Sequence, residues 1–476
     1  MFGTSGIRKV FSPYGNDTKQ FTPSTALKIG LAIGAYIKGK TVVIGRDIRT
    51  TAIPIELALN SGLISSGCKV LTLGMVTTPT LAMSMKFLNA DCGVMITASH
   101  NTPEYIGIKL WNPSGLGFTP EQELDVENIY KKNSFRKIKW DEVGMVTHVN
   151  DINTLHVDEI LKRIKLNPKN GIRQVIIDPG NGSSCEIAPL LLKRLGCKFV
   201  TLNSQPDGHF PGRLSEPSSE NLKIVSDIIK HSPNIDLGIA LDGDADRVIF
   251  IDANGEIIEP IRMLTFLAKK ELERHSPKKG TKVNVMTPIN SSNVIERVLE
   301  PLGCNIIRTQ VGDIKVAVEI QKLGGIMGGE NSGTYIWPTH HMGPDSLVTI
   351  AKLIEILSYE KRSFTELIAE IPNFPFVKKE YPLTYDKIIS QEEYREMGTI
   401  IEPWLVEDQG FTDIKYNNID GLRMDFDKGW ILIRRSGTSP ILRVEGESIV
   451  DAQTTHKNLN AVAKILANSY DFIQLK

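Results

Sequence analysis

Residues 41–74, TVVIGRDIRTTAIPIELALNSGLISSGCKVLTLG, decide the fold class of this chain. They contain a β-rich run, a polar loop, a helical stretch with periodic apolar residues, a Gly-Cys pair and a second β-rich run. Alternation of strands with amphipathic helices predicts βαβ units, in which helices cover a mostly parallel or mixed sheet. The segment therefore indicates an α/β domain.

The same order of elements occurs twice more along the 476 residues. RQVIIDPGNGSS at 173–184 is followed by EIAPLLLKRL and GCKFVTLN, and KVNVMTPINSS at 282–292 is followed by NVIERVLEPL and GCNIIRTQVG. In each copy the glycine before the cysteine fits the end of a helix, where only glycine accepts a positive φ at low cost. Three copies in one order predict three similar α/β domains with mixed sheets.

Each copy then closes with a further apolar strand that runs into a polar loop. These segments are GVMITASHN from Gly93, GIALDGDAD from Gly238 and GIMGGENSG from Gly325. Six residues after the opening glycines lie Ser99, Asp244 and Asn331. Ligands of α/β proteins bind beyond the carboxyl ends of the strands, so we expect the equivalent loops to converge on one central cleft.

The pattern changes after residue 371. NFPFVKKEYPL contains two prolines and is typical of a linker. The segment GLRMDFDKGWILIRRSGTSPILRVEGES predicts two β-runs around a Ser-Gly-Thr turn, and a helical stretch follows it. We therefore expect a distinct C-terminal α+β domain, with domain boundaries at 1–148, 149–254, 255–371 and 372–476.

Composition and charge exclude several classes of protein. The 55 Lys and Arg residues balance the 55 Asp and Glu residues, so no net field favours a nucleic acid or an anionic membrane as partner. The five cysteines are widely spaced without a CxxC pair, which favours buried thiols over disulfides or a zinc site. MFGTSGIRKV lacks an apolar signal core, and no run approaches the roughly 18 apolar residues of a membrane helix. We expect a soluble, cytoplasmic protein.

The loop ALDGDADRV places Asp242, Asp244 and Asp246 at alternate positions after an apolar strand. Three carboxylates this close repel one another, so they either form a solvated acidic turn or share a cation. Hard oxygen ligands suit Mg²⁺, which completes its shell with water and substrate phosphate. A further alternative is the aspartate-nucleophile phosphatase pattern, in which Asp242 attacks phosphate and Asp244 acts as the acid.

The loop TASHN at 97–101 contains a candidate nucleophile, Ser99. It lacks the flanking glycines of an acyl-transfer nucleophile elbow. A phosphorylated serine fits better, because phosphoserine carries about −1.5 to −2 charges and needs cations around it. Lys109, His100 and the expected Mg²⁺ can supply these charges. On this loop alone, a polar turn without function remains equally open.

Two further loops have residue types that suit an anion or a sugar. RRSGTSPILR combines a Ser-Gly-Thr turn with Arg434, Arg435 and Arg443, and backbone N–H groups with guanidinium forks bind phosphate. GGENSGT places Glu330 and Ser332 among glycines, which suits hydrogen bonds to sugar hydroxyls. A solvated basic turn is the alternative for the first loop, and the second loop is weak evidence alone.

Five of these motifs, in order, resemble the signature loops of the α-D-phosphohexomutase family: FGTSGIR, TASHN with GIK after it, DGDADR, GGENSG and RRSGTSP. The family includes phosphoglucomutase/phosphomannomutase and phosphoglucosamine mutase. The resemblance covers essentially the whole chain and is specific for the family, although not for the sugar. It implies four domains around one cleft, the first three alike, in agreement with the repeat.

The resemblance implies a phosphotransferase that interconverts hexose 6-phosphate and hexose 1-phosphate. A phosphoserine, here Ser99, gives its phosphoryl group to the substrate, and the resulting hexose 1,6-bisphosphate turns over and returns its other phosphate. The resemblance implies that Mg²⁺ is held by Ser99, Asp242, Asp244 and Asp246, and that Arg8 and Lys109 lie beside the transferred group, with His100 and Arg247 flanking these motifs. It implies that sugar hydroxyls are bound by Glu330 and Ser332. The non-reacting phosphate is matched by Arg434, Ser436, Gly437, Thr438 and Arg443. Lys109, or a partner such as His100, is the candidate general base, and the sequence does not choose between them.

The chain departs from the family pattern at four positions, Thr102, Ile106, Thr334 and Ser439. The family commonly has proline, asparagine, histidine and glutamate there, so the departures concern the support of the serine loop and the fine substrate preference. MFGTSGIR and the SGT turn favour glucosamine phosphate, with phosphomannomutase/phosphoglucomutase as the alternative.

An aspartyl-nucleophile sugar phosphatase and a non-catalytic phosphosugar-binding protein are alternatives from other classes. We expect a small-molecule phosphosugar as the partner, no nucleic acid or membrane partner, and a monomer or homodimer.

Overall fold

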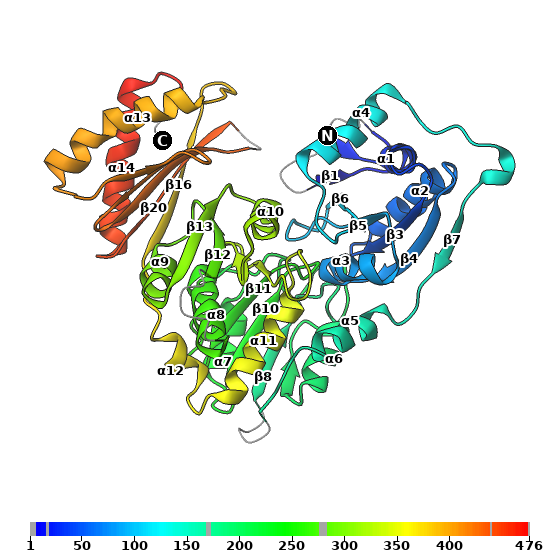
Figure 1. Ribbon diagram of the computed structural model, residues 1–476, viewed down its shortest axis with the longest axis horizontal. Helices are drawn as coiled ribbons and strands as arrows, with labels where there is room; N and C mark the ends of the chain where they lie inside the picture. Colours follow the sequence, from blue (N-terminus) through cyan, green and yellow to red (C-terminus); the bar gives the residue numbers. More distant parts are fainter. Residues whose placement is uncertain (1–5, 16–18, 168–172, 276–282, 438–439, 475–476) are drawn as a thin grey trace. The chain divides into compact units, whose positions relative to one another are not determined.

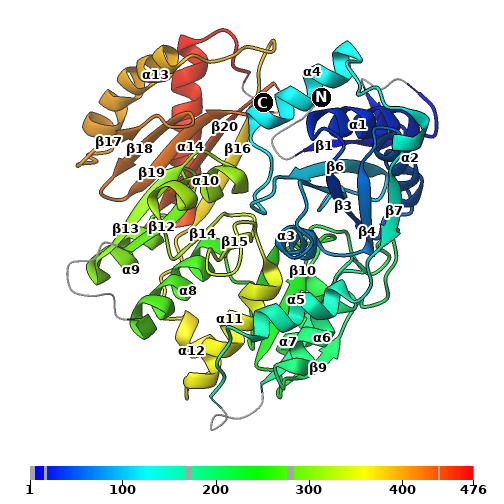
Figure 2. The same ribbon diagram turned by 45° about the vertical axis from the view of Figure 1, so that its right-hand side comes forward.

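The computed structural model describes residues 6–15, 19–167, 173–275, 283–437 and 440–474. The chain folds into two compact units, Met1–Pro260 with Ser332–Ala369, and Ile261–Asn331 with Glu370–Lys476. Figure 1 and Figure 2 label their helices and strands in two views. Each unit is described by itself.

The first unit begins with a seven-stranded mixed sheet in the order β2-β1-β6-β5-β3-β4-β7. Its strands are β1 Ile7–Phe11, β2 Gln20–Phe21, β3 Thr41–Arg46, β4 Lys69–Met75, β5 Cys92–Ile96, β6 Tyr105–Trp111 and β7 Met145–His148. Its helices are α1 Pro23–Tyr36, α2 Ala52–Ile64, α3 Thr78–Phe87 and α4 Pro120–Lys132, with a 3₁₀ turn η1 at Trp140–Glu142. β3 pairs in parallel with β4 and β5, whereas β6 is antiparallel to both β5 and β1.

Helices cover both faces of this sheet. Successive side chains of a strand point to opposite faces, so neighbouring residues of β3 pack against different helices. Val42 and Ile44 of β3 belong to the core that contains α1 and α2, and Val43 belongs to the core that contains α3. α1 and α2 cross closely through glycines, since a Cβ on Gly30 would lie 2.4 Å from Leu59 O. Thr77 caps α3 through its hydroxyl, and this fixes where α3 begins.

The rest of the first unit contains a four-stranded sheet in the order β11-β10-β8-β9. Its strands are β8 Gln174–Asp178, β9 Lys198–Thr201, β10 Leu237–Leu241 and β11 Val248–Asp252. The helices here are α5 Ile152–Leu161, α6 Ile187–Arg194 and α7 Lys223–Lys230, and residues 332–369 add β15 Tyr335–Ile336, α11 Ser346–Tyr359 and α12 Phe364–Ile368. α11 packs against α5 and α6.

The second unit contains two sheets. In the first, β12 Val283–Pro288 pairs in parallel with β13 Cys304–Thr309 and β14 Met327–Gly329. The accompanying helices are α8 Pro260–His275, α9 Val294–Leu299, the 3₁₀ turn η2 Glu300–Leu302 and α10 Asp313–Leu323. The second sheet has the order β16-β20-β19-β18-β17 and is antiparallel.

The antiparallel sheet belongs to the C-terminal part of the chain. Its strands are β16 Phe376–Pro382, β17 Lys415–Asn417, β18 Leu422–Phe426, β19 Gly429–Arg435 and β20 Ile441–Ser448, and its helices are α13 Gln391–Pro403, the π-helical turn η3 Trp404–Asp408 and α14 Ala452–Ser469. One face packs on α13 and α14. The other face presents Trp430 and Leu432 to Ile289, which follows β12.

The threefold repeat expected from the sequence is confirmed. In all three copies the first strand pairs in parallel with the next two strands: β3 with β4 and β5, β8 with β9 and β10, and β12 with β13 and β14. The glycines before the cysteines, Gly67, Gly196 and Gly303, have φ of 78°, 76° and 82°. The α/β fold class with a distinct α+β C-terminal domain is therefore confirmed, whereas the domain boundaries stay predictions.

No helix in the described ranges is both long and apolar enough to cross a membrane.

Candidate active site

Ser99 lies in the loop between β5 and β6, and its side chain is fully buried. Its φ of 51° is in the left-handed region, so the chain turns sharply at this residue. The backbone N–H of Ser99 donates to Thr97 Oγ1 over 2.8 Å, and its carbonyl accepts from Ser215 Oγ over 2.8 Å. These contacts hold the backbone and leave Ser99 Oγ to donate to Asp242 Oδ2 over 2.9 Å.

The three aspartates of DGDAD lie between β10 and β11 and are buried. One oxygen from each lies within 4.8 Å of the others. Asp244 Oδ2 accepts hydrogen bonds from Thr78 Oγ1 (2.7 Å), Thr97 Oγ1 (3.1 Å) and Lys109 Nζ (3.2 Å). Lys109 Nζ also donates to Asp246 Oδ2 over 2.5 Å. A serine hydroxyl from the loop after β5 and a lysine ammonium from β6 therefore meet three carboxylates from the loop between β10 and β11.

Burial and charge set the protonation of this group. Burial, followed by repulsion from Asp246 and Asp244, raises the pKa of Asp242 well above its usual value. Burial also acts to raise the pKa of Asp244, but Lys109 and the Thr78 hydrogen bond outweigh it and hold that pKa far below normal. Burial opposes the charge of Lys109, yet the carboxylates of Asp244 and Asp246 raise its pKa. Asp244 and Lys109 are thus a charged pair.

The carboxylates fit a bound divalent cation. Asp244 Oδ1 and Asp246 Oδ1 are buried and form no hydrogen bond, so two anionic oxygens lack the donors that buried polar atoms normally have. A cation would satisfy both oxygens and reduce the repulsion among the three charges. Three carboxylates and no nitrogen or sulfur donor make a hard ligand set, which suits Mg²⁺.

Three further expected residues lie around this centre. Arg8 of β1 donates from Nη1 to Asn101 Oδ1 over 3.3 Å, and its buried Nε has no hydrogen-bond partner. The ring of His100 places Nδ1 3.4 Å from Ser99 Oγ. Burial, together with three nearby cations, lowers the pKa of His100 to about 2, so its ring is neutral. Arg247 lies 3.8 Å from Asp246 Oδ1 through Nε.

Arg49 was not expected from the sequence, although it holds the serine loop directly. It follows β3, is 1% exposed and forms an ion pair with Asp47 over 3.0 Å. Its guanidinium donates to four backbone carbonyls of the loop: Ser99 O (2.8 Å), Asn101 O (2.7 Å), Thr102 O (2.6 Å) and Tyr105 O (3.2 Å). These acceptors are main-chain atoms, so the side chain of Thr102 plays no part in them.

The two departures in this loop region have separate explanations. Thr102 Oγ1 donates to Glu104 Oε1 over 2.7 Å at the exposed surface. Ile106 is fully buried in the core of the first sheet, where an apolar side chain fits. Neither side chain contacts Ser99 in a hydrogen bond, so the support of the loop comes from Arg49 and Ser215.

The remaining expected residues belong to the second unit, except Ser332, which belongs to the first. Arg434 and Arg443 lie directly opposite each other on β19 and β20, and their Nε atoms pair with Asp420 Oδ2 (2.9 Å) and Glu380 Oε1 (3.1 Å). Ser436 is buried and its N–H donates to Ile441 O, Gly437 follows it at the exposed turn, and Thr438 lies outside the described residues. Glu330 Oε1 accepts from Gly312 N over 2.8 Å. In the first unit, Ser332 Oγ lies 3.3 Å from Thr334 Oγ1.

Comparison with known families decides the identity of this arrangement. Four models described as phosphoglucomutase/phosphomannomutase match the chain in order: alpha/beta/alpha domain I at residues 1–137, domain II at 154–255, domain III at 261–374 and the C-terminal domain at 404–465. The chain belongs to the α-D-phosphohexomutase family. It is a phosphomutase, an isomerase that transfers a phosphoryl group within its substrate, as the resemblance of its five loops predicted.

Relatives and solved structures agree over nearly the full length. The chain is 39% identical to the probable phosphoglucosamine mutase of Methanopyrus kandleri, covering 94% of this chain and 93% of that protein. It is 37% identical to the phosphoglucosamine mutase of Methanocaldococcus jannaschii and to the phosphoglucomutase/phosphomannomutase of Thermococcus kodakarensis, covering 94% of each chain. The crystal structure of a phosphoglucomutase/phosphomannomutase family protein from Burkholderia thailandensis matches with a TM-score of 0.81 and 26% identity, covering 97% of both chains.

Proposed function

We propose that this phosphohexomutase interconverts glucosamine 6-phosphate and glucosamine 1-phosphate through a phosphoserine at Ser99 and a 1,6-bisphosphate intermediate. The observation that carries the proposal is the hydrogen bond of 2.9 Å from Ser99 Oγ to Asp242 Oδ2, within a buried group of carboxylates that also contains Lys109. The names of the Methanopyrus and Methanocaldococcus relatives support glucosamine as the sugar.

Asp242, Asp244, Asp246 and a phosphate oxygen on Ser99 would hold Mg²⁺. When bound, this ion supplies positive charge that stabilises the transferring phosphoryl group. Arg8 and Lys109 add fixed positive charge from the protein, and their positions are set before substrate arrives. The unpartnered Nε of Arg8 is a donor available to a phosphate oxygen.

The first transfer breaks the bond between phosphorus and Ser99 Oγ and forms a bond from phosphorus to a substrate hydroxyl. A base takes the proton of that hydroxyl. The leaving Ser99 Oγ takes up a proton and becomes a hydroxyl again, so no net proton is gained or lost. Lys109 Nζ donates to two carboxylates, Asp244 Oδ2 and Asp246 Oδ2, so it is an ammonium with no lone pair to accept a proton. His100 is neutral, and a phosphoryl dianion on the adjacent Ser99 would raise the low pKa of its ring, because opposite charge favours the imidazolium. We therefore assign the general base to His100 and electrostatic stabilisation to Lys109.

The second transfer is the reverse of the first with the substrate turned around. After the bisphosphate reorients, its other phosphoryl group returns to Ser99, and the proton moves back. One phosphate always remains at the non-reacting site, for which we propose Arg434, Arg443 and the Ser436–Gly437 turn. Family membership decides against the aspartyl-nucleophile phosphatase that the DGDAD motif alone left open.

We expect kcat/KM to be higher on glucosamine 6-phosphate than on glucose or mannose 6-phosphate by about tenfold, the effect of one net hydrogen bond to the 2-amino group. The measurement is a comparison of kcat/KM for the three substrates under saturating Mg²⁺ and 1,6-bisphosphate activator. A higher kcat/KM on mannose or glucose phosphate would assign the chain to the phosphomannomutase/phosphoglucomutase activity instead. No turnover of any of the three would contradict the hexose assignment itself.

Arg49→Lys is expected to lower kcat by about 10–100-fold with KM changed by no more than about twofold. A lysine ammonium has three donors on one atom and cannot reach four carbonyls and Asp47 together, so the serine loop loses its fixed position. Arg46→Lys is the matched control, because the guanidinium of Arg46 pairs with Glu56 of α2 over 3.0 Å instead of with the loop carbonyls. Faster amide hydrogen exchange across 97–105 should accompany the loss in Arg49→Lys alone, and a kcat within twofold of wild type would refute the role.

A further inference from the structure

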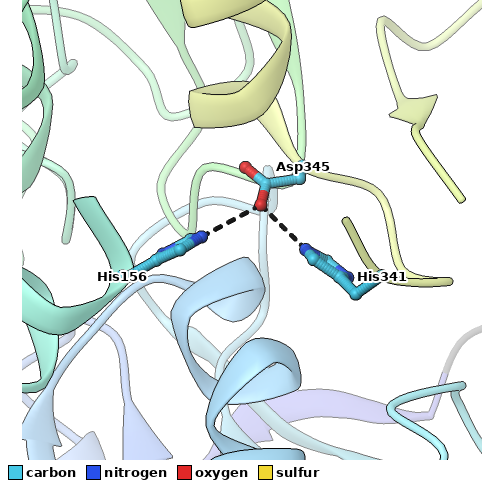
Figure 3. A group of neighbouring side chains, drawn as sticks. All are labelled: His156, His341 and Asp345. Atoms are coloured by element: carbon cyan, nitrogen blue, oxygen red, sulfur yellow. Dashed lines mark hydrogen bonds and ion pairs between the residues drawn. The ribbon is translucent and has the colours of Figure 1, made fainter. Parts of the chain in front are cut away.

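A second cluster of titratable side chains lies in the first unit, apart from the carboxylates of DGDAD. His156 of α5 and His341 of the loop before α11 both direct Nε2 at one oxygen of Asp345 (Figure 3). The distances to Asp345 Oδ2 are 3.1 Å from His156 and 2.8 Å from His341. The side chains of His156 and Asp345 are 1% exposed, so the pair is sealed from solvent.

Two histidines and a carboxylate are also a common metal-ligand set, but the hydrogen bonds here oppose that role. Asp345 Oδ1 accepts the backbone N–H groups of Leu347 and Val348, and Asp345 Oδ2 accepts from Nε2 of both histidines. His341 Nδ1 accepts the N–H of Gly343 over 3.1 Å, so the proton of a neutral His341 is on Nε2. That proton points to Asp345 and occupies the lone pair that a metal would need.

His156 connects the starts of two helices. Its Nε2 donates to Asp345, the N-cap of α11, and its Nδ1 lies 2.9 Å from the hydroxyl of Thr80 in the first turn of α3. Thr80 Oγ1 is in turn 2.7 Å from Oγ1 of Thr77, the N-cap of α3. Nε2 of the ring bonds to Asp345 and Nδ1 to the hydroxyl of Thr80, so one imidazole ring ties the first turn of α3 to the first turn of α11.

Both helix starts hold the carboxylate loop. In α3, Thr78 N donates to Asp244 O over 2.9 Å and Thr78 Oγ1 donates to Asp244 Oδ2 over 2.7 Å. In α11, Ser346 Oγ donates to Ala245 O over 2.6 Å. Two consecutive carbonyls of the loop are thus fixed from two sides, at the point where Ala245 has a φ of 57°. A non-glycine residue keeps such a conformation only when its surroundings hold it there.

We propose that His156 and Asp345 are positioning residues for the carboxylate loop: they fix the spacing of the α3 and α11 starts, and through them the orientation of the carboxylates that bind the divalent cation. The proposal rests on the proposed function, in which Asp242, Asp244 and Asp246 hold Mg²⁺. It predicts that His156, whose side chain bonds to Thr80 and Asp345, changes the affinity of Asp242, Asp244 and Asp246 for the metal.

The two links of His156 can be removed one at a time. The amide of a glutamine reaches the place of Nε2 and retains the bond to Asp345, whereas the amide of an asparagine reaches the place of Nδ1 and retains the bond to Thr80. We expect the Kd for Mn²⁺, used as the probe and measured by electron paramagnetic resonance of the free ion, to rise about threefold in His156→Gln and His156→Asn and about tenfold in His156→Ala. The KM for the sugar phosphate should change by less than about twofold.

His148→Gln is the control, because His148 lies on β7 and its ring lies 3.4 Å from Thr72 Oγ1 of β4, so it bonds to a strand and not to a helix start. A lower melting temperature in the His156 variants with a wild-type Mn²⁺ Kd would overturn the proposal, since a merely structural role predicts that result. Stoichiometric Zn²⁺ binding to the wild type that is lost in His156→Asn would overturn it too, by making the cluster a metal site. Asp242→Asn tests the proposed metal site separately from the positioning role of His156 and Asp345. Unchanged Mn²⁺ binding in that variant refutes the metal site itself.

Discussion

Ser99→Ala is expected to lower kcat by ~10⁴-fold or more, because it removes the oxygen that we propose as the carrier of the phosphoryl group between substrate and product. The buried backbone of the loop should remain in place, since its bonds to Thr97, Ser215 and Arg49 use main-chain atoms of Ser99. Substrate should still bind, so the loss appears in kcat and not in KM. The measurement is steady-state isomerisation, with intact mass spectrometry to follow the phosphorylated fraction of wild type and variant.

Ser84→Ala provides the matched control for this substitution. Ser84 is also fully buried, but its hydroxyl donates only to Leu81 O within α3 over 2.7 Å. The Ser84→Ala variant should retain the wild-type kcat and the wild-type phosphorylated fraction in the intact mass spectrum. Activity of Ser99→Ala above about 1% of wild type, or a phosphate found on another peptide, would show that Ser99 is not the carrier.

The repeat carried most of the fold prediction because it depends on local patterns. A polar loop, an apolar helix and a Gly-Cys pair recur at fixed spacing, and each pattern is visible within about thirty residues. Parallel pairing of β3 with β4 and β5, and its repetition in the other two copies, follows from that order. The same logic placed Ser99 and Asp244 at equivalent loops, and the structure puts Ser99 Oγ and Asp242 Oδ2 2.9 Å apart.

Arg49 shows why part of the site could not be predicted. Its partners in the loop are four main-chain carbonyls, and every residue has a carbonyl, so nothing in the side chains of 99–105 indicates that an arginine from the loop after β3 holds them. The available signal was weak: an Asp-x-Arg pair directly after an apolar strand, at the edge of the sheet where the ligand loops lie.

His156 shows a second limit, which is distance along the chain. Its partner Asp345 is 189 residues away and its partner Thr80 is 76 residues away. In sequence, His156 is one polar residue in a short amphipathic helix, and such histidines usually have no special role. Only the packing of α3, α5 and α11 brings the three together.

Asp244→Asn is expected to lower kcat by about 100-fold and to raise the Mg²⁺ concentration needed for half-maximal activity. Asp244 Oδ2 accepts from Thr78, Thr97 and Lys109 at once, and Oδ1 is left without a donor. An asparagine of the same shape must turn its NH₂ group toward one of these two sites. At Oδ2 it would face three donors, including a charged ammonium; at Oδ1 it would block the oxygen that we assign to the cation. Either orientation removes a negative charge from the site.

Asp252→Asn makes the same chemical change where no cation is proposed. Asp252 ends β11, is 1% exposed and accepts the N–H groups of Asn254 and Glu256 through Oδ1. It should therefore lower the melting temperature while leaving the Mg²⁺ dependence as in wild type. If both variants lose stability equally and Asp244→Asn keeps the wild-type Mg²⁺ dependence, the buried carboxylates serve the fold alone and Lys109 is their counterion. A shift in Mg²⁺ dependence in Asp244→Asn alone requires that the unpartnered oxygens of the loop take part in holding the ion.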